Sequence, residues 1–276
     1  MDRPTSKPER WSHYLQHDPE SSQQFWREML GRANKDLLLI LGLGFDPRMC
    51  AGVQTILEGG GAGRRVCLLL TYNEGRGSPS QKHAPDVNSN YKDLHRRMKD
   101  YGRIHEKKFD VWTDDGKWVG SRRACQSIDR EMLLAFTDIV VDISAMPRGI
   151  YLPILGKILS LLDDEKHTSN HSVNLHVMVA ENVELDKRIQ EKELGEASYL
   201  HGFAADLWVQ ADSGVPTLWI PILGEGKAEQ LRRIHDLCRP DEVCPVLPSP
   251  AINPRSLSRN RRDLKGFEPC HGSFFD

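Results

Sequence analysis

The sequence lacks several features that would assign it directly to a class of protein. No run of apolar residues approaches the roughly 18 that a membrane-spanning helix needs; the longest run is 37–43. Residues 1–8 are polar and do not contain the apolar stretch of a secretory signal. None of the six cysteines belongs to a C-x-x-C pair. We therefore expect a cytoplasmic protein with free thiols, no membrane span and no structural zinc site.

Motifs that are recognisable by their spacing are absent too. No Gly-Lys-Ser/Thr follows the glycines near residue 42, so there is no Walker loop, and no G-x-S-x-G elbow occurs. Pro47 replaces the third glycine of a dinucleotide fingerprint, and Ile40 stands where methyltransferases usually have an acidic residue. No cofactor can therefore be named from a motif.

What is present is the composition of an ordinary globular protein. The chain has 276 residues, of which 39% are hydrophobic and 28% charged, and 37 basic residues nearly balance 39 acidic ones. This length suits one large domain or two modest ones with a substantial core. The balanced charge gives no general preference for nucleic acid.

Apolar runs typical of buried strands alternate along the chain with segments of helical periodicity. The predicted strands are 36–43, 65–72, 108–113, 137–144, 173–180, 217–222 and 243–247. The predicted helices are 49–57, 91–101, 121–134, 150–162, 185–194 and 227–237. This alternation predicts an α/β fold, a Rossmann-like three-layer sandwich with a mostly parallel sheet of about six strands.

Three segments follow from composition. Residues 1–35 form a predicted helical extension, 36–247 the Rossmann-like domain, and 248–276 a basic C-terminal arm. Trp11 and Trp26 of the extension are expected to pack against the domain, although docking of a protein partner is an alternative. The basic charge of the arm suggests that it contacts a protein partner or nucleic acid. The alternative is that the arm is an exposed surface segment without a partner. Residues 73–90 have no period and are predicted to be a long loop.

The first candidate site is the turn Gly42-Leu-Gly-Phe-Asp-Pro-Arg48 after the first predicted strand. Ligands of open parallel sheets bind beyond the carboxyl ends of strands, where helix N-termini offer free amides. Gly42 and Gly44 would allow the backbone to approach a ligand, Asp46 would bind hydroxyls, and Arg48 would neutralise an anion. In an equally open alternative the glycines only form a tight turn, and Asp46 caps the helix.

The second candidate is the turn Asp142-Ile-Ser-Ala-Met-Pro-Arg-Gly149, which also follows a predicted buried strand. Asp142 and Ser144 alternate and are expected to face the same side. Arg148 follows one turn later, as Arg48 does in the first turn. If the two strands are neighbours, the two turns would form one composite pocket; capping and an Asp–Arg pair remain the alternative.

Two other groups of residues give weaker indications of a site. Asn73 and Glu74 end the second strand, where dinucleotide-binding domains have an acid that binds ribose. His167, His171 and His176 have no spacing that would bring them together, so they are expected to face solvent and not to bind a metal.

The two turns, together with Asn-Pro-Arg at 253–255, resemble uncharacterised bacterial Rossmann-like proteins found in gene clusters for defence against phage and plasmids. The resemblance covers residues 36–265 and implies a component of a multi-protein conflict system that senses or processes a nucleotide-like ligand. It assigns no catalytic residue.

We therefore expect a protein that binds a nucleotide-type or phosphorylated ligand at the carboxyl edge of the sheet. If it is an enzyme, nucleotide hydrolysis or glycosyl transfer by two carboxylates is the natural reaction. The alternatives are a non-enzymatic scaffold subunit and nucleic-acid binding through the basic arm. The predicted catalytic residues are Asp46 and Asp142, and the predicted ligand-binding residues are Gly42, Gly44, Arg48, Ser144 and Arg148.

Overall fold

The computed structural model describes residues 14–75, 78–166, 173–182, 197–200, 216–224 and 227–247. The chain divides into two units, Met1–Glu184 and Leu185–Asp276. The domain predicted over 36–247 spans this division, and the predicted arm, 248–276, lies outside the described residues together with Trp11.

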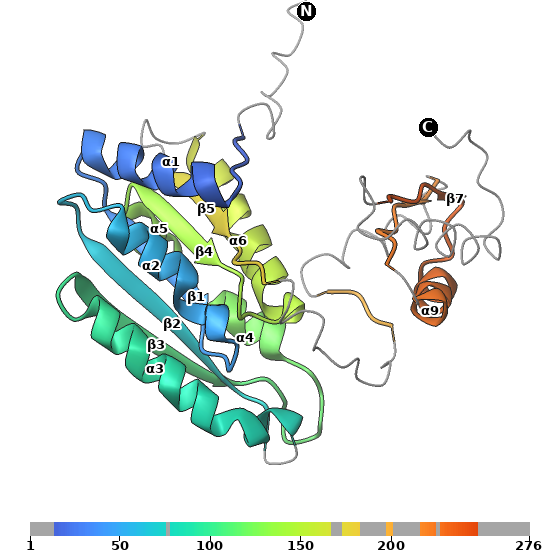
Figure 1. Ribbon diagram of the computed structural model, residues 1–276. Helices are drawn as coiled ribbons and strands as arrows, with labels where there is room; N and C mark the ends of the chain where they lie inside the picture. The colour runs from blue at the N-terminus through green and yellow to red at the C-terminus, as the bar shows by residue number, and fades with distance from the viewer. Residues whose placement is uncertain are drawn as a thin grey trace, which may run out of the picture. The chain divides into compact units, whose positions relative to one another are not determined.

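The first unit is built on a five-stranded parallel sheet with the strand order β3-β2-β1-β4-β5 (Figure 1). The strands are β1 (Leu37–Gly42), β2 (Arg65–Asn73), β3 (Gly102–Asp110), β4 (Asp138–Asp142) and β5 (Asn174–Met178). The central strand, β1, is buried along its whole length, as its continuous apolar run predicts for a strand covered on both faces.

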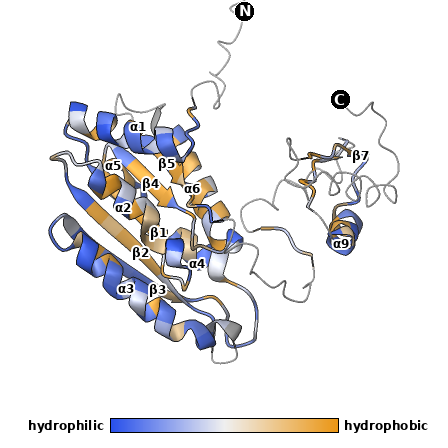
Figure 2. Cartoon of the chain, viewed as in Figure 1, coloured by the Kyte–Doolittle hydropathy of each residue, from blue (hydrophilic) through white to orange (hydrophobic). Residues whose placement is uncertain are grey.

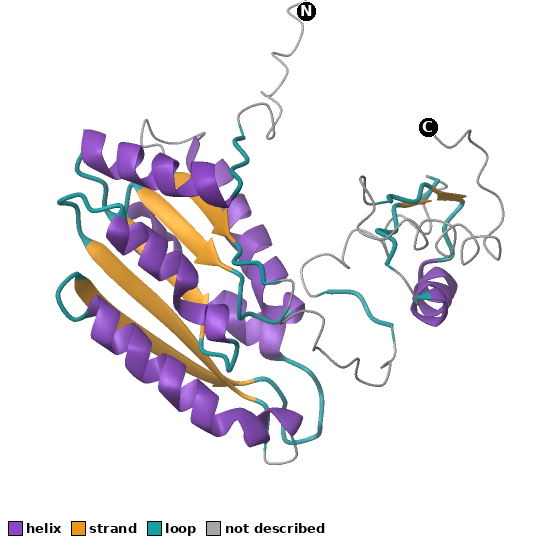
Figure 3. Ribbon diagram, viewed as in Figure 1, coloured by secondary structure: helices purple, strands orange, loops and turns teal. Residues whose placement is uncertain are grey.

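Helices cover both faces of this sheet (Figure 3). On one face lie α1 (Pro19–Arg32), α2 (Ala51–Glu58) and α3 (Ala84–Met98); on the other lie α4 (Gly120–Gln126), α5 (Arg130–Leu134) and α6 (Arg148–Lys166). The predicted Rossmann-like three-layer sandwich is therefore confirmed, with five strands in the sheet where about six were predicted.

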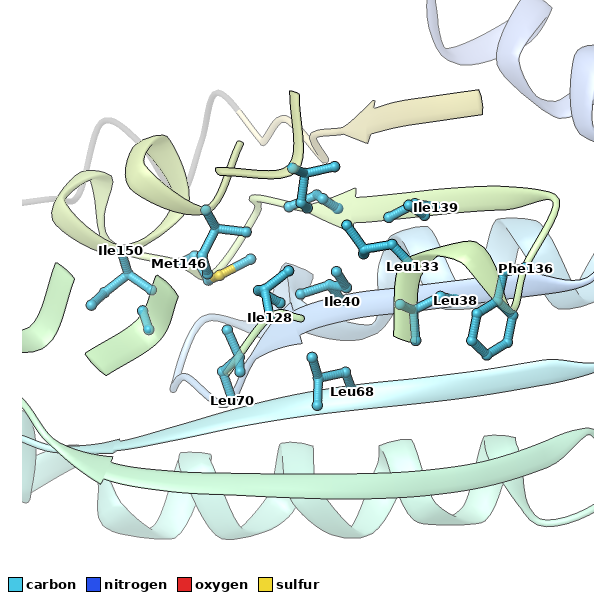
Figure 4. Close-up of a cluster of buried hydrophobic side chains, with 14 of the residues drawn as sticks. Leu38, Ile40, Leu68, Leu70, Ile128, Leu133, Phe136, Ile139, Met146 and Ile150 are labelled. Atoms are coloured by element: carbon cyan, nitrogen blue, oxygen red, sulfur yellow. The ribbon is translucent and has the colours of Figure 1, made fainter. Parts of the chain in front are cut away.

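Alternation along β1 divides its side chains between two hydrophobic cores. Leu38 and Ile40 pack against α5 and α6 in the cluster drawn in Figure 4. Leu37, Leu39 and Leu41 pack with side chains of α1, α2 and α3 on the opposite face. The hydropathy colouring follows this arrangement, because the central strands are apolar while the outer surface of α3 is hydrophilic (Figure 2).

Within the predicted N-terminal extension, the described helix α1 packs against the domain as predicted. Asp18 caps α1 by accepting a hydrogen bond from the backbone N–H of Ser21 at 2.8 Å. Trp26 and Leu30 are each only 2% exposed and belong to the core that contains α2. The centroids of the Trp26 ring and of the His176 ring on β5 lie 5.0 Å apart, and the His176 side chain is only 18% exposed. The prediction that His176 faces solvent is therefore wrong.

Several element boundaries differ from the predicted ones. β3 begins at Gly102, whereas the sequence predicted a strand only from residue 108. The first part of the strand was missed because an exposed, charged edge strand lacks the apolar run that marks a buried strand. The predicted loop over 73–90 contains the short 3-10 helix η2 (Pro79–His83) and the first turns of α3. The predicted helix 121–134 is divided into α4 and α5, since Asp129 caps a new helix by accepting from the N–H of Met132 at 2.7 Å.

The segments predicted as the last strands form a separate sheet in the second unit. There β6 (Leu218–Trp219) pairs in parallel with β7 (Glu242–Val243), and α9 (Ala228–Cys238) lies between them in the chain. The predicted helix 185–194, His167 and His171 lie outside the described residues. In the described part of the chain, no helix combines the length and apolar content that a membrane span requires.

Candidate ligand-binding site

The order of strands in the sheet creates a switch point between β1 and β4. The chain runs from β1 outward through β2 and β3, and then returns to place β4 on the other side of β1. The connection after β1 leads to α2 on one face, and the connection after β4 leads to α6 on the other. In open parallel sheets, ligands bind in the crevice that such diverging connections leave at the strand ends.

A pocket of about 300 Å³ lies at this position. Its walls are residues 43–46 after β1, Thr71, Tyr72 and Glu74 at the end of β2, Ser80 and Val87 from the following segment, and residues 144–147 after β4. The two turns singled out from the sequence are thus neighbours, because Leu41 pairs directly with Asp142. Both turns contribute to one cavity.

The glycines of the first turn allow the two turns to pack against each other. A Cβ atom on Gly42 would overlap with Cγ of Met146 and lie 3.3 Å from the Tyr72 ring. A Cβ atom on Gly44 would lie 3.0 Å from the carbonyl oxygen of Ala145. Close contact between turns therefore accounts for both glycines without a ligand.

Asp46 is ion-paired with Arg48, two residues away. Its Oδ2 lies 2.6 Å from the Arg48 guanidinium, and its Oδ1 accepts from both the backbone N–H and Nε of Arg48 at 2.9 Å. Burial alone would raise the pKa of Asp46, but the hydrogen bonds and charge of Arg48 outweigh it and hold the pKa below its ordinary value. Asp46 therefore caps η1 (Pro47–Cys50) and also lines the pocket as a carboxylate.

Asn90 of α3 fixes the first turn from outside, although no pattern in the sequence points to it. Its side-chain amide donates to the carbonyl oxygens of Gly44 and Asp46, each at 2.9 Å. One side chain thereby holds the turn at two points. These two hydrogen bonds connect α3 to the pocket wall that this turn forms.

Asp142 does not share the pocket with Asp46. Its side chain is 5% exposed and is not among the described residues that line the pocket. Oδ1 of Asp142 accepts from the backbone N–H of Ser144 at 2.9 Å, whereas Oδ2 has no hydrogen-bond partner among the described residues. Oδ2 faces the start of α2, where a Cβ atom on Gly52 would overlap with this oxygen. Burial raises the pKa of Asp142. The structure thus does not bring the two predicted catalytic carboxylates together.

Ser144 and Arg148 take different positions. Ser144 lines the pocket, and its hydroxyl oxygen accepts from the backbone N–H of Ala180, at 2.8 Å, which ties the turn to the end of β5. Arg148 is exposed at the first residue of α6 and does not line the pocket.

The rest of the pocket wall is formed by residues that the sequence did not indicate as binding residues, apart from Glu74. Oγ1 of Thr71 is buried and has no hydrogen-bond partner in the described part of the chain, and Glu74 accepts from the hydroxyl of Ser78. Phe45 is 45% exposed and stacks on His83 with 4.2 Å between ring centroids. Two of these residues had a signal in the sequence: Glu74 ends a predicted strand, and Phe45 lies within the first candidate turn. Thr71 had none, because it becomes a neighbour of the two turns only through the strand order.

The second unit has a hollow of about 340 Å³ at the end of α9. The described residues that line it are His235, Asp236, Arg239 and Pro240, all from one stretch of chain. No group of three or more potential metal ligands occurs among the described residues of either unit. The pocket at the switch point is therefore the stronger candidate for a binding site.

Comparison with known proteins adds no family to this description. No protein-family model matches the chain, and a search of curated proteins finds no significant similarity. The resemblance to proteins of anti-phage gene clusters therefore stays a prediction, and function is inferred from the pocket.

Proposed function

We propose that the protein binds a nucleotide-type small molecule in the pocket at the carboxyl edge of its sheet. The observation that carries this proposal is the convergence of the segments after β1, β2 and β4 on one cavity at the switch point. Ligands of open α/β sheets bind at this place in the fold.

The lining chemistry is compatible with such a ligand. Leu43, Phe45 and Val87 provide an apolar wall for a planar base. The Ser80 hydroxyl and the Glu74 carboxylate provide polar groups for hydrogen bonds. A cavity with mostly apolar walls and a few polar groups is typical of small-molecule sites.

The proposal is for binding and not for catalysis by paired carboxylates. Such a reaction would require Asp46 and Asp142 in one cavity, and Asp142 faces α2 instead. Membership of a defence system does not follow from the pocket and is not needed for ligand binding.

Filling the pocket tests this function. Val87 lines the cavity from α3, so Val87→Phe would occupy ligand space, whereas Asn88→Phe places the same ring on the exposed surface of the same helix. We expect a ligand from a panel of nucleosides and nucleotides to raise the Tm of the wild type and of Asn88→Phe but not that of Val87→Phe. Isothermal titration calorimetry would measure the affinities.

Two results would contradict the proposal. Equal affinity of Val87→Phe and wild type would place the ligand elsewhere on the molecule. Absence of binding by every member of the panel would favour the alternative of a scaffold subunit. The Tm of each variant without ligand serves as the check that it is folded.

A further inference from the structure

The charge of the pocket restricts which part of a ligand can enter it. Two carboxylates, those of Asp46 and Glu74, are among its lining residues, and none of the described residues that line it is Lys, Arg or His. Arg48 already pairs with Asp46 at 2.6 Å, so its charge is directed to that carboxylate. A phosphate group inside the pocket would therefore face negative charge without a matching cation from the described lining.

The hydrogen-bonding groups of the pocket instead suit hydroxyl donors. Carboxylate oxygens only accept, and Glu74 stands at the end of β2 beside the cavity. The Ser144 hydroxyl is already engaged, because its oxygen accepts from the backbone N–H of Ala180 and its side chain hydrogen-bonds the Asp142 carboxylate. The Thr71 hydroxyl oxygen is buried within the protein. The Glu74 carboxylate therefore remains as an acceptor for the adjacent hydroxyls of a sugar.

The size of the cavity points the same way. A volume of about 300 Å³ lies at the lower end of the range of roughly 300–1,000 Å³ for small-molecule sites. This space suits one base with its sugar and is too small for a dinucleotide. The apolar wall around Phe45 would contact the base, and aromatic rings favour such planar partners.

We infer that the pocket recognises the nucleoside part of its ligand: the carboxylate of Glu74 accepts from the sugar hydroxyls, and any phosphate lies outside the cavity. This inference rests on the proposed function, since it specifies the ligand of the same pocket. It predicts a preference for ribose over deoxyribose and no gain in affinity from a 5′-phosphate.

Calorimetric titration of the wild-type chain with matched ligands tests the inference. The ligands are the four common ribonucleosides, their 2′-deoxy counterparts and their 5′-monophosphates. For a ribonucleoside that binds, we expect its 2′-deoxy form to bind about 10- to 100-fold more weakly, the effect of losing a hydrogen bond to a charged group. The 5′-monophosphate should bind no more tightly than the nucleoside.

A charge-neutral variant separates the role of Glu74 from general effects. Glu74→Gln should weaken ribonucleoside binding about 10-fold or more while changing the affinity for the deoxynucleoside much less. Glu58→Gln removes the same charge from an exposed position at the end of α2 and should change neither affinity. Thermal melting confirms that both variants are folded.

The outcomes distinguish this inference from the proposed function. Tighter binding of a monophosphate than of its nucleoside, or equal binding of ribose and deoxyribose forms, would overturn the inference while leaving a ligand in the pocket. If no member of the set binds, the proposed function is overturned together with the inference. Binding that is blocked by Val87→Phe but unaffected by Glu74→Gln would assign the hydroxyl recognition to other groups and refute the role of Glu74.

Discussion

Replacing Gly52 with alanine should destabilise the protein, although alanine normally favours a helix. Gly52 lies in the first turn of α2, and a Cβ atom there would overlap with Oδ2 of Asp142 and lie 3.1 Å from its Cγ. The carboxylate would have to move, which would break its 2.9 Å hydrogen bond from the N–H of Ser144. The usual gain from Gly to Ala in a helix is at most about 1 kcal/mol.

The magnitude follows from the two costs. Overpacking in a buried site costs about 1–3 kcal/mol, and a lost hydrogen bond to a charged group costs about 1.5–3 kcal/mol. After subtraction of the helix propensity, we expect Gly52→Ala to lower the free energy of unfolding by about 1.5–5 kcal/mol. For a unit of this size, Tm should fall by about 3–20 °C.

A matched glycine provides the control for this measurement. Gly31 lies in α1, and a Cβ atom added to it would meet nothing within 4 Å, so Gly31→Ala should stabilise the protein by a few tenths to about 1 kcal/mol. Urea denaturation followed by tryptophan fluorescence and far-UV circular dichroism would measure both variants at about pH 7.

The contact itself is tested in an Asp142→Ala background. Removal of the carboxylate leaves space for the new methyl group, so Gly52→Ala should there cost less than about 1 kcal/mol. If Gly52→Ala stabilises the wild type as Gly31→Ala does, or if its cost is the same with and without the carboxylate, Asp142 is not held against α2 and the reasoning fails.

Two further predictions concern buried titratable groups. Asp138 is fully buried, with its Oδ2 3.3 Å from Nζ of Lys35 and its Oδ1 3.0 Å from Nε2 of His176. Burial alone would raise the pKa of Asp138, but the hydrogen bonds from His176, Thr137 and Asn174 hold this pKa well below its ordinary value. A carboxyl group with a lowered pKa stabilises the folded state at pH values above its pKa in the unfolded chain, and this stability is lost as the pH falls below that value. In urea denaturation, Asp138→Asn should therefore lower the free energy of unfolding by about 3 kcal/mol at about pH 7 and by less at about pH 3. An equal loss at both pH values would contradict this. Burial also raises the pKa of the Cys50 thiol to about 12, so this thiol should not react with iodoacetamide in the native state. Mass spectrometry should show that the exposed Cys244 is alkylated in the native protein and that Cys50 is alkylated only after unfolding. Native labelling of Cys50 at a comparable rate would refute it.

The fold was predictable where burial imposes a pattern on the sequence. β1 and β4 are covered on both faces, so their continuous apolar runs mark them as strands. β3 is an edge strand in which most side chains are exposed and charged, and its first half therefore carried no strand signal. The segments of β6 and β7 have local strand character, but local sequence does not specify which sheet a strand joins.

The candidate site was predictable only in its location. Its two turns follow strands that were identified correctly, and the strand order makes them neighbours. The direction of the Asp142 side chain was not anticipated, because the sequence does not show which face of the sheet α2 covers. In the structure, Asp142 lies on the same face of β4 as Val140, which belongs to the core on the α2 face. Phe45, Thr71 and Ser80 come from three different segments, and no spacing along the chain relates them.

The glycines at this edge of the sheet allow close contacts within the protein. In phosphate-binding Rossmann domains, glycines allow the backbone to approach the ligand. Here Gly42, Gly44 and Gly52 instead face Met146, Ala145 and Asp142, so each one allows two protein segments to approach each other. A ligand bound as proposed would therefore be recognised through side chains such as Glu74. A side-chain carboxylate accepts hydrogen bonds from sugar hydroxyls and repels a phosphate, which agrees with the proposed nucleoside preference.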